Sequence, residues 1–426
     1  MALRRYLMST IITILFASGA IAAEQYDPAN FYAHLDSVYS LEDDNLVDYL
    51  AADIEAFIHA HPNHDKAPDA LLMLARLWED RGKERDALLR FAQVQFLYPS
   101  SEAAALAREG RDRMLSEIGD YPPTVLHLPD DGSVGESRAD RRFAFLQAVY
   151  SIEDDHLSEW LQDQLHLFMA DYPDYERIET VYRWSAGVYA LDRDRHEARA
   201  AYQRYSALFP NDDNLPLVKT RLAVVLEEQF GDEDEAYDAY GKVVTNWPES
   251  EHSAYALIRR AELAEDDRRD YRAAIDDYRL LITKWPRHEH AKEALYKIAR
   301  IKQEKLGAHI SAIETYNEFV RNYPDDSRAI EALKQSSEIY ARQLDDHASA
   351  ARQLARIGRE YPEHPDAIPM LLEASEIAVD KLDDWDLAIE FLRDITEQFR
   401  NQPEARQAQL RINKLMIAKT EEERGK

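Results

Sequence analysis

The chain has 426 residues, no cysteine and a formal net charge of −29. This composition excludes disulfides, thiol catalysis and cysteine-ligated metals, and so acidic a surface disfavours nucleic acid and anionic lipid headgroups. Hydrophobic residues make up 45% of the sequence, with only 12 glycines, which favours a folded and mainly helical protein. The charge suits cationic partners or a saline habitat, and the sequence does not separate the two.

Residues 1–23 predict a cleaved secretory signal peptide. Two arginines precede an apolar stretch from Leu7 to Ile21, and small residues follow, an order typical of exported proteins. Cleavage before Ala23 and cleavage before Glu24 both fit the pattern. No later stretch has the roughly 18 uninterrupted apolar residues that a membrane span needs. We therefore expect a periplasmic protein with no membrane span after cleavage.

Prolines divide the rest of the chain into units of nearly constant length. The spacing between neighbouring prolines is 37 or 38, with one gap of 74. A fixed period between about 20 and 50 residues indicates a repeat array. The prolines are Pro62, Pro99, Pro173, Pro210, Pro248, Pro286, Pro324 and Pro362.

Other positions keep the same period. A small residue lies 12 before most of these prolines, a bulky one 8 before, an aromatic directly before, and a small residue 13 after; for Pro324 they are Ala312, Tyr316, Tyr323 and Ser337. Residues four apart share a helix face, and proline ends a helix. Each unit therefore predicts two paired helices and a stop, and stacked pairs bury a continuous core.

The turns inside the pairs are expected at one offset from the proline. Residues at that offset are glycine or aspartate in five units, as turns favour. They are Gly82, Gly231, Gly307, Asp345 and Asp383.

One nine-residue motif occurs twice. Residues 38–46 read VYSLEDDNL, and residues 149–157, three periods later, read VYSIEDDHL. Calcium would need about six oxygen ligands, and no EF-hand pattern appears. We interpret the acidic run as a turn that caps the next helix, copied with a duplicated block of about three repeats.

No other motif predicts chemistry. His59, His61 and His64 lie close together in the sequence but lack the spacing of a zinc site and are interpreted as polar turn residues. Nucleophile-elbow, Walker and dinucleotide-binding motifs are absent. The sequence therefore predicts neither an enzyme nor a cofactor nor a metal.

Residues 121–140, YPPTVLHLPDDGSVGESRAD, interrupt the array. They are rich in proline, glycine, serine and aspartate and predict a loop or linker. The predicted organisation is a signal peptide (1–23), N-terminal helical repeats (24–120), this linker, and a C-terminal repeat array (141–426).

The chain resembles the tetratricopeptide repeat (TPR) family over about residues 30–415. The family's A-x3-[Y/F]-x7-P pattern stands at Ala312, Tyr316 and Pro324 and in several other units. The unit here is longer than that of the family, which has about 34 residues, and the W-x2-L-G start of the first helix is absent. The resemblance implies an all-α, right-handed α-α superhelix, a TPR-like solenoid.

The repeats are more closely similar to those of two bacterial envelope adaptors. Residues 312–333, AIETYNEFVRNYPDDSRAIEAL, resemble the repeat lipoprotein of the β-barrel assembly machine and the repeat protein associated with the Tol–Pal system. This chain lacks the lipid-bearing cysteine of the first and the N-terminal coiled coil of the second. What the resemblance implies is an adaptor role without catalysis.

In this family the first helices line the concave side, so residues beside the packing position of each first helix are candidate partner contacts. Aromatic and arginine side chains are frequent interface anchors, although an ordinary solvated groove at these positions is the competing interpretation. The candidates are Arg183, Tyr255, Glu262, Tyr296, Arg300, Lys334 and Glu338.

The sequence thus predicts a periplasmic scaffold that binds a protein or peptide during cell-envelope assembly or maintenance. The partner is expected to be basic if the net charge selects it. A structural subunit of a polysaccharide synthesis or export system is the alternative. The partner's identity, the pathway and the oligomeric state do not follow from the sequence.

Overall fold

The computed structural model describes residues 27–118 and 136–425. The predicted signal peptide and most of the predicted linker lie outside the described residues. The chain divides into two compact units, unit 1 (Met1–Pro210) and unit 2 (Asn211–Lys426). Within the described ranges, the regular elements are all helices.

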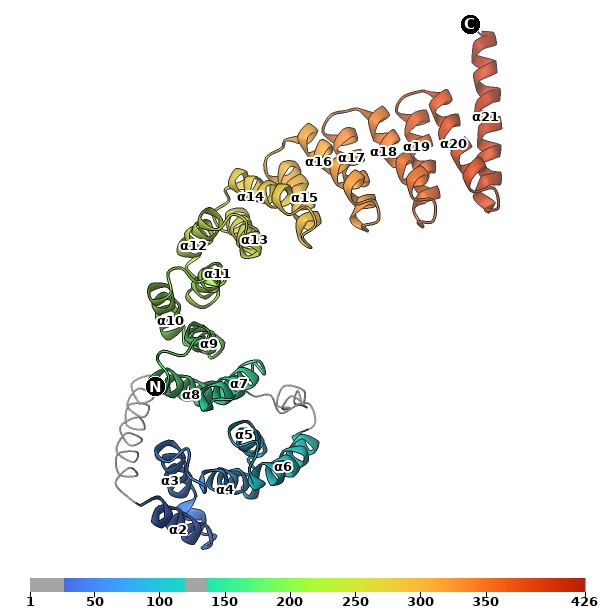
Figure 1. Cartoon of the computed structure of the whole chain (residues 1–426). Helices are drawn as coiled ribbons and strands as arrows, with labels where there is room; N and C mark the ends of the chain where they lie inside the picture. The colour runs from blue at the N-terminus through green and yellow to red at the C-terminus, as the bar shows by residue number, and fades with distance from the viewer. Residues whose placement is uncertain (1–26, 119–135, 426) are drawn as a thin grey trace. The chain divides into compact units, whose positions relative to one another are not determined.

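Unit 1 consists of helical hairpins (Figure 1). Short 3-10 turns, η1 (Asp44–Leu46) and η3 (Asp155–Leu157), precede two of its helices. Its helices are α2 (Pro28–Tyr39), α3 (Val47–Ala60), α4 (Ala67–Asp80), α5 (Glu84–Leu97), α6 (Glu102–Ile118), α7 (Arg138–Tyr150), α8 (Ser158–Asp171), α9 (Ile178–Leu191) and α10 (Arg195–Leu208).

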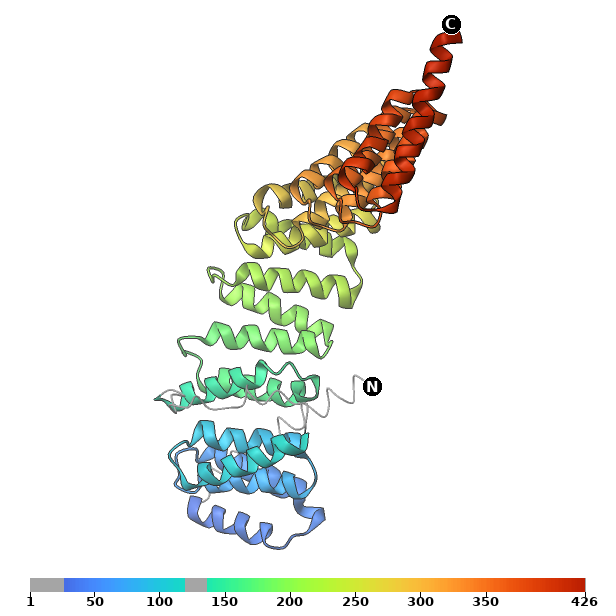
Figure 2. The ribbon, with the colours of Figure 1, turned by 90° about the vertical axis from the view of Figure 1, so that its right-hand side faces the viewer.

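Unit 2 stacks its helices one after another (Figures 1 and 2). Two of them end in a π-helical turn, η4 (Leu226–Phe230) and η5 (Ile301–Lys305). Its helices are α11 (Leu215–Val225), α12 (Glu233–Asn246), α13 (Glu251–Asp266), α14 (Tyr271–Lys284), α15 (Ala291–Arg300), α16 (His309–Asn322), α17 (Arg328–Arg342), α18 (His347–Glu360), α19 (Ala367–Asp380), α20 (Trp385–Gln398) and α21 (Pro403–Gly425).

The expected pairing of helices is confirmed. We call the first helix of each repeat the A helix (α11, α13, α15, α17 and α19 in unit 2) and the second the B helix. The small residue expected on each B helix is fully buried, as at Ala236 and Ala274, and so is its bulky neighbour, Tyr240 or Tyr278. The small A-helix residues, such as Ala261, are buried against them. The fold class is therefore an all-α solenoid of TPR-like pairs.

The aromatic before each proline ends its B helix. Trp247, for example, is the C-cap of α12, and its N–H donates to the carbonyl oxygen of Val243. The side chains of these residues are half-buried, and the proline that follows prevents another helical turn.

Every turn predicted inside a pair carries a residue with positive φ. Gly231 and Asp345 have φ of 66° and 53°, and the same position holds two residues that the sequence did not single out, Arg193 and Arg269, at 56° and 53°. This conformation suits glycine and costs other L-residues energy. The turn geometry is therefore fixed by the fold even where the residue type does not favour it.

The duplicated block is visible in the helix boundaries. Helices α3, α4 and α5 have the same lengths as α8, α9 and α10, and each begins and ends three periods before its copy. The repeated motif forms the same turn twice, since Glu42 and Glu153 both have positive φ, 51° and 55°. Asp43 and Asp154 each accept a backbone N–H two residues later and so cap the 3-10 turns η1 and η3. The α-helices that follow, α3 and α8, have no side-chain cap of their own, so the capping is one short turn earlier than predicted.

Helix α5 occupies a different position from its copy α10. All residues from Ala87 to Leu97 of α5 are buried, whereas α10 buries only a single stripe. The Phe96 ring of α5 lies 5.6 Å from that of Phe145 in α7, and the Arg90 guanidinium lies 5.4 Å from the Trp160 ring of α8. The described helices on both sides of residues 121–140 thus share one core.

Two further observations bear on the predicted organisation. Helix α7 begins at Arg138, so the last residues of the segment predicted as a linker are helical; the division at this segment otherwise stays a prediction. None of the described helices has the length and apolar character that a membrane span requires.

Candidate functional site

A regular line of tyrosine hydroxyls joins the B helices of unit 2 to their A helices. Tyr240 donates to Glu227 at 2.8 Å, and Tyr278 contacts Glu265 at 3.4 Å. Tyr316 donates to Gln303 at 2.7 Å. Each acceptor lies at the same distance in the sequence before its tyrosine. The buried ring fills the core while its hydroxyl reaches the polar side of the A helix.

The two shorter hydrogen bonds involve the π-helical turns. Glu227 lies in η4 and Gln303 in η5, whereas Glu265 lies in the regular α-helix α13. A π turn inserts an additional residue and changes the direction of nearby side chains. The two repeats that contain a π-helical turn are therefore the ones in which the acceptor lies closest to the tyrosine hydroxyl.

Ion pairs connect the tyrosine–acceptor contacts of one repeat with those of the next. Arg259 of α13 pairs with Glu227 of the preceding repeat and with Glu262 on its own helix, the latter at 2.7 Å. Lys297 of α15 reaches back to Glu262 at 2.8 Å and to the Tyr278 hydroxyl at 3.2 Å. A continuous polar network thus runs from η4, the turn that ends α11, across α13 to α15.

Burial and neighbouring charges shift the pKa values of the residues in this network. Burial raises the pKa of Tyr240 above its usual value, and the charge of Glu227 adds to the effect. Burial also raises the pKa of Tyr278, with Glu265 contributing. For Arg259, burial acts against the cation, but the hydrogen bond and charge of Glu227 outweigh it, so the pKa is raised. The tyrosines therefore stay protonated donors and Arg259 stays charged at neutral pH.

A pocket of about 250 Å³ opens beside this network, between α13, α14 and α15. Apolar groups are contributed by Ile258 and Ala294, both buried. The charged side chains of the ion pairs lie around them. The lining residues are Tyr255, Ile258, Arg259, Glu262, Tyr278, His290, Glu293, Ala294 and Lys297.

Two of the predicted contact residues line this pocket. Tyr255 is 38% exposed, and its ring lies 6.4 Å from that of Tyr240. Glu262 links Arg259 to Lys297. The structure therefore places Tyr255 and Glu262, which were selected only by their positions in the repeat, at the same pocket.

The other predicted residues of unit 2 lie on α15 and α17 and are engaged within the fold. Tyr296 packs its ring 5.4 Å from that of Phe319. Lys334 pairs with Asp366 of the next repeat at 2.6 Å. Arg300 and Glu338 each pair with a residue four positions later on the same helix.

Arg183 belongs to unit 1. It lies on α9 and is partly buried. The predicted set is therefore divided between the two units.

Arg259, Lys297 and Tyr278 complete the site, and the sequence did not select them. Arg259 and Lys297 occur at one register, since each follows the proline of its repeat, Pro248 or Pro286, at the same offset. This regularity was available in the sequence. The acid that they share, Glu262, was selected by register, but its pairing with both cations becomes visible only in the structure.

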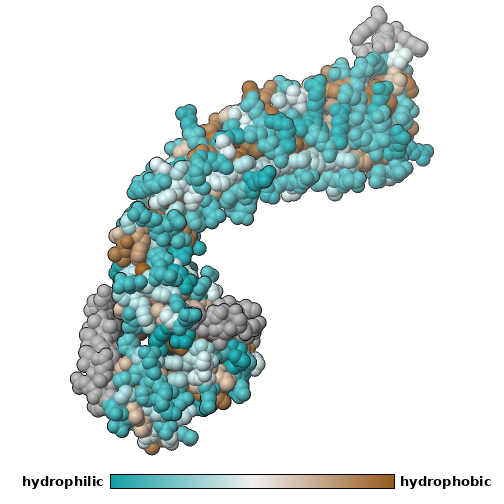
Figure 3. Space-filling view, in the orientation of Figure 1, coloured by the Kyte–Doolittle hydropathy of each residue, from teal (hydrophilic) through white to brown (hydrophobic). Residues whose placement is uncertain are grey.

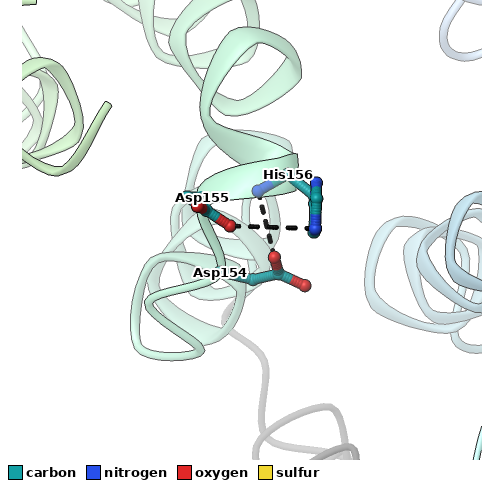
Figure 4. A group of neighbouring side chains, drawn as sticks. All are labelled: Asp154, Asp155 and His156. Atoms are coloured by element: carbon teal, nitrogen blue, oxygen red, sulfur yellow. Dashed lines mark hydrogen bonds and ion pairs between the residues drawn. The ribbon is translucent and has the colours of Figure 1, made fainter. Parts of the chain in front are cut away.

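The acidic turn of the second motif copy contains a compact group of side chains (Figure 4). The ligand atoms of Asp154, Asp155 and His156 lie within 4.8 Å of one another. Asp154 accepts the His156 backbone N–H at 3.0 Å, and the other two side chains are exposed. The geometry is that of a helix-capping turn, and nothing else at this position indicates an ion.

Part of unit 2 matches a known family. Residues 220–250 and 293–326 match the tetratricopeptide repeat family. Each stretch contains part of an A helix and the whole of the following B helix, α12 or α16. The first includes Glu227 and Tyr240, and the second includes Gln303 and Tyr316. The match thus supports the predicted TPR character for the repeats before and after α13 and α14, which lie between the two matched stretches.

Several solved structures match parts of this chain. A tetratricopeptide repeat protein from Parabacteroides merdae ATCC 43184 is 13% identical, with 65% of this chain and 99% of that chain covered and a TM-score of 0.35. The MamA protein is 19% identical, with 42% and 94% covered and a TM-score of 0.30. The apo form of RapI is 11% identical, with 91% and 98% covered and a TM-score of 0.37.

The sequence matches none of the curated proteins with which it was compared.

Proposed function

We propose that this chain is a non-catalytic scaffold that binds a protein or peptide segment along the A helices of unit 2, from α11 to α17. The observation that carries the proposal is the pocket at Tyr255, set in a polar network that spans three consecutive A helices. Repeats of the matched family generally serve as protein-interaction scaffolds, which supports a protein partner.

The surface of unit 2 suits a partner that binds by mixed contacts. On the side of unit 2 seen in Figure 3, most of the surface is hydrophilic and hydrophobic residues lie in small separate patches. Interfaces that form and dissociate are typically of this mixed composition. We therefore propose reversible capture of a segment rather than a permanent apolar interface.

We propose the periplasm as the location and the assembly or maintenance of the cell envelope as the process. The support is the signal-peptide pattern of residues 1–23. Fractionation of cells and N-terminal sequencing of the product test this step. A mature chain that begins at Ala23 or Glu24 in the periplasmic fraction is the expected result, and a full-length chain in the cytoplasm would contradict it.

Cross-linking in living cells tests the binding role. A photoreactive phenylalanine analogue replaces Tyr255, and in a matched strain it replaces Asp276, an exposed residue of the B helix α14. We expect a protein adduct at Tyr255 that is much weaker at Asp276. No adduct at either position, together with a polysaccharide bound to the purified chain, would favour the structural-subunit alternative.

A further inference from the structure

We propose that the pocket between α13, α14 and α15 receives one large apolar side chain from an extended segment of the partner, while Arg259 and Lys297 donate to backbone carbonyl oxygens of that segment. This inference rests on the proposed function and specifies the partner's chemistry. It replaces selection by basic charge with selection by one apolar anchor.

The size and lining of the pocket indicate a single side chain. Its volume is about 250 Å³, whereas pockets for drug-sized ligands are about 300–1,000 Å³. Ile258 and Ala294 are 8% and 3% exposed, and the ring of Tyr255 adds apolar surface. A buried apolar side chain gains about 25 cal/mol for each Å² removed from water, so an apolar anchor fits these walls.

The cations of the pocket retain unused donors. Arg259 has five N–H groups, and three hydrogen bonds engage it, two to Glu227 and one to Glu262. Lys297 has three N–H groups and uses two, toward Glu262 and the Tyr278 hydroxyl. Within the described residues, donors therefore remain beside the pocket.

Neutral acceptors suit these donors better than charged ones. The charges of Arg259 and Lys297 are already balanced by Glu227 and Glu262, and both oxygens of Glu262 accept hydrogen bonds. Glu293, half-exposed at the pocket, adds a negative charge. An incoming carboxylate would be repelled by Glu293, and no unpaired cation would compensate for this repulsion. A backbone carbonyl carries no net charge and can accept hydrogen bonds from the free N–H groups.

The charge around the pocket does not select a basic segment. Residues 251–342 contain 17 Asp and Glu and 17 Lys and Arg, although the chain as a whole carries −29. The acidity of the protein is therefore concentrated away from α13–α17. The charges of α13–α17 therefore provide no net long-range attraction for cations.

A displayed peptide library tests the inference. The probe is a library of short random peptides inserted between two folded display domains, so that no peptide ends in a free carboxylate. It is selected on the mature full chain at physiological salt. Selected sequences are then made as labelled peptides with blocked ends, and their binding is measured by fluorescence anisotropy.

Pocket variants provide the comparison. Glu293→Trp places an indole at the mouth of the pocket, and Ala294→Met fills it from the wall. Glu331→Trp is the matched control, since Glu331 has the same register on α17 and does not line this pocket. Circular dichroism melting establishes whether each variant is folded. If one of the two pocket variants is unfolded, the comparison uses the other.

We expect the selected peptides to share one Phe, Leu, Ile, Met or Trp, with at least tenfold weaker binding to the pocket variants and less than twofold change with Glu331→Trp. Enrichment of lysine-rich or arginine-rich peptides, equal binding to the pocket variants, or enrichment of no peptide would overturn the inference. A protein adduct at Tyr255 in cells would still stand in each case, so failure of the anchor and failure of the scaffold role are separable.

Discussion

Tyr240 donates its hydroxyl hydrogen to Glu227, in the A helix of the same repeat, at 2.8 Å. The relationship returns in the repeat of Tyr316 and Gln303 at 2.7 Å, with a neutral amide in place of the carboxylate. One geometry is thus occupied by a charged and by a neutral acceptor. In the next repeat the bulky residue is Leu354 and the line of hydroxyls ends.

The difference between the two acceptors predicts unequal effects of removing the hydroxyl. Tyr240→Phe should destabilise the fold by about 1.5–2 kcal/mol, because a hydrogen bond to a charged group contributes about 1.5–3 kcal/mol. Tyr316→Phe should cost about 1 kcal/mol. Urea unfolding followed by circular dichroism measures both, and their midpoints are compared at equal slope.

Both variants keep the aromatic ring in the core, so the comparison isolates the effect of the hydroxyl group. Both rings are almost fully buried, and phenylalanine preserves that packing. Equal losses for the two variants would contradict the role assigned to the charge of Glu227.

The turn positions predict a stabilising substitution. Arg269 has φ of 53° where the equivalent residue of the previous repeat is Gly231, with φ of 66°. Arg269→Gly should raise stability by about 1 kcal/mol. A non-glycine residue in this region costs roughly 1–2 kcal/mol, and the higher entropy of glycine in the unfolded chain offsets part of that gain.

The reciprocal substitution is the control. A Cβ at Gly231 would meet nothing within 4 Å, so Gly231→Ala tests backbone conformation without a clash and should be destabilising. Thermal melts of both variants are the measurement. A shift of the same sign in the two would show that positive φ does not determine their stability.

The limits of sequence-based inference follow from the range of each interaction. The spacing of Ala236 and Tyr240 is local, so it predicted which face is buried. The duplicated motif predicted the turns at Glu42 and Glu153, because a copied sequence folds alike. The contact of Phe96 with Phe145 depends instead on how the chain returns after residues 121–140, and no local pattern encodes that return.

The same distinction holds for the candidate site. Register brought out Tyr255 and Glu262, since residues seven apart on a helix share a face. The pocket itself is made by three helices, and the pairing of Lys297 with Glu262 links positions on two successive A helices. Tyr296 shows the opposite outcome, because the next repeat covers its ring with Phe319.

The start of α17 predicts a pH-dependent contribution. Asp326 accepts hydrogen bonds from Arg328, which hold the pKa of that carboxyl well below its usual value of 3.8; Lys292 lies 3.1 Å away. A depressed pKa contributes stability above the unfolded value that is lost as the pH falls. Asp326→Asn should therefore cost about 1–3 kcal/mol at pH 7 and less with decreasing pH below about 4.

Urea unfolding at several pH values, each compared with Asp325→Asn, measures that contribution. Asp325 is the exposed neighbour in the same turn and should show little effect. A cost of Asp326→Asn that is constant from pH 7 to pH 3 would exclude the ion pairs as its source.

The close packing of α5 and α6 predicts a size-dependent clash. A Cβ added at Gly110 would lie 2.5 Å from ring carbons of Phe91, and Phe91 is 1% exposed. Gly110→Ala should therefore destabilise unit 1 by about 1–3 kcal/mol, as overpacking of a core typically does. In isolation, alanine would be the better helix residue by about 1 kcal/mol, so a loss identifies the clash.

Phe91→Leu supplies the test of the mechanism. Alone it leaves a cavity and should be destabilising, but in the double variant the smaller side chain gives the new methyl group space. The double variant should then lose less stability than the sum of the losses in the two single variants. We expect a coupling of about 0.5–3 kcal/mol in a double-mutant cycle. Strict additivity would mean that Gly110 is required for backbone conformation and not for the approach of α6 to α5.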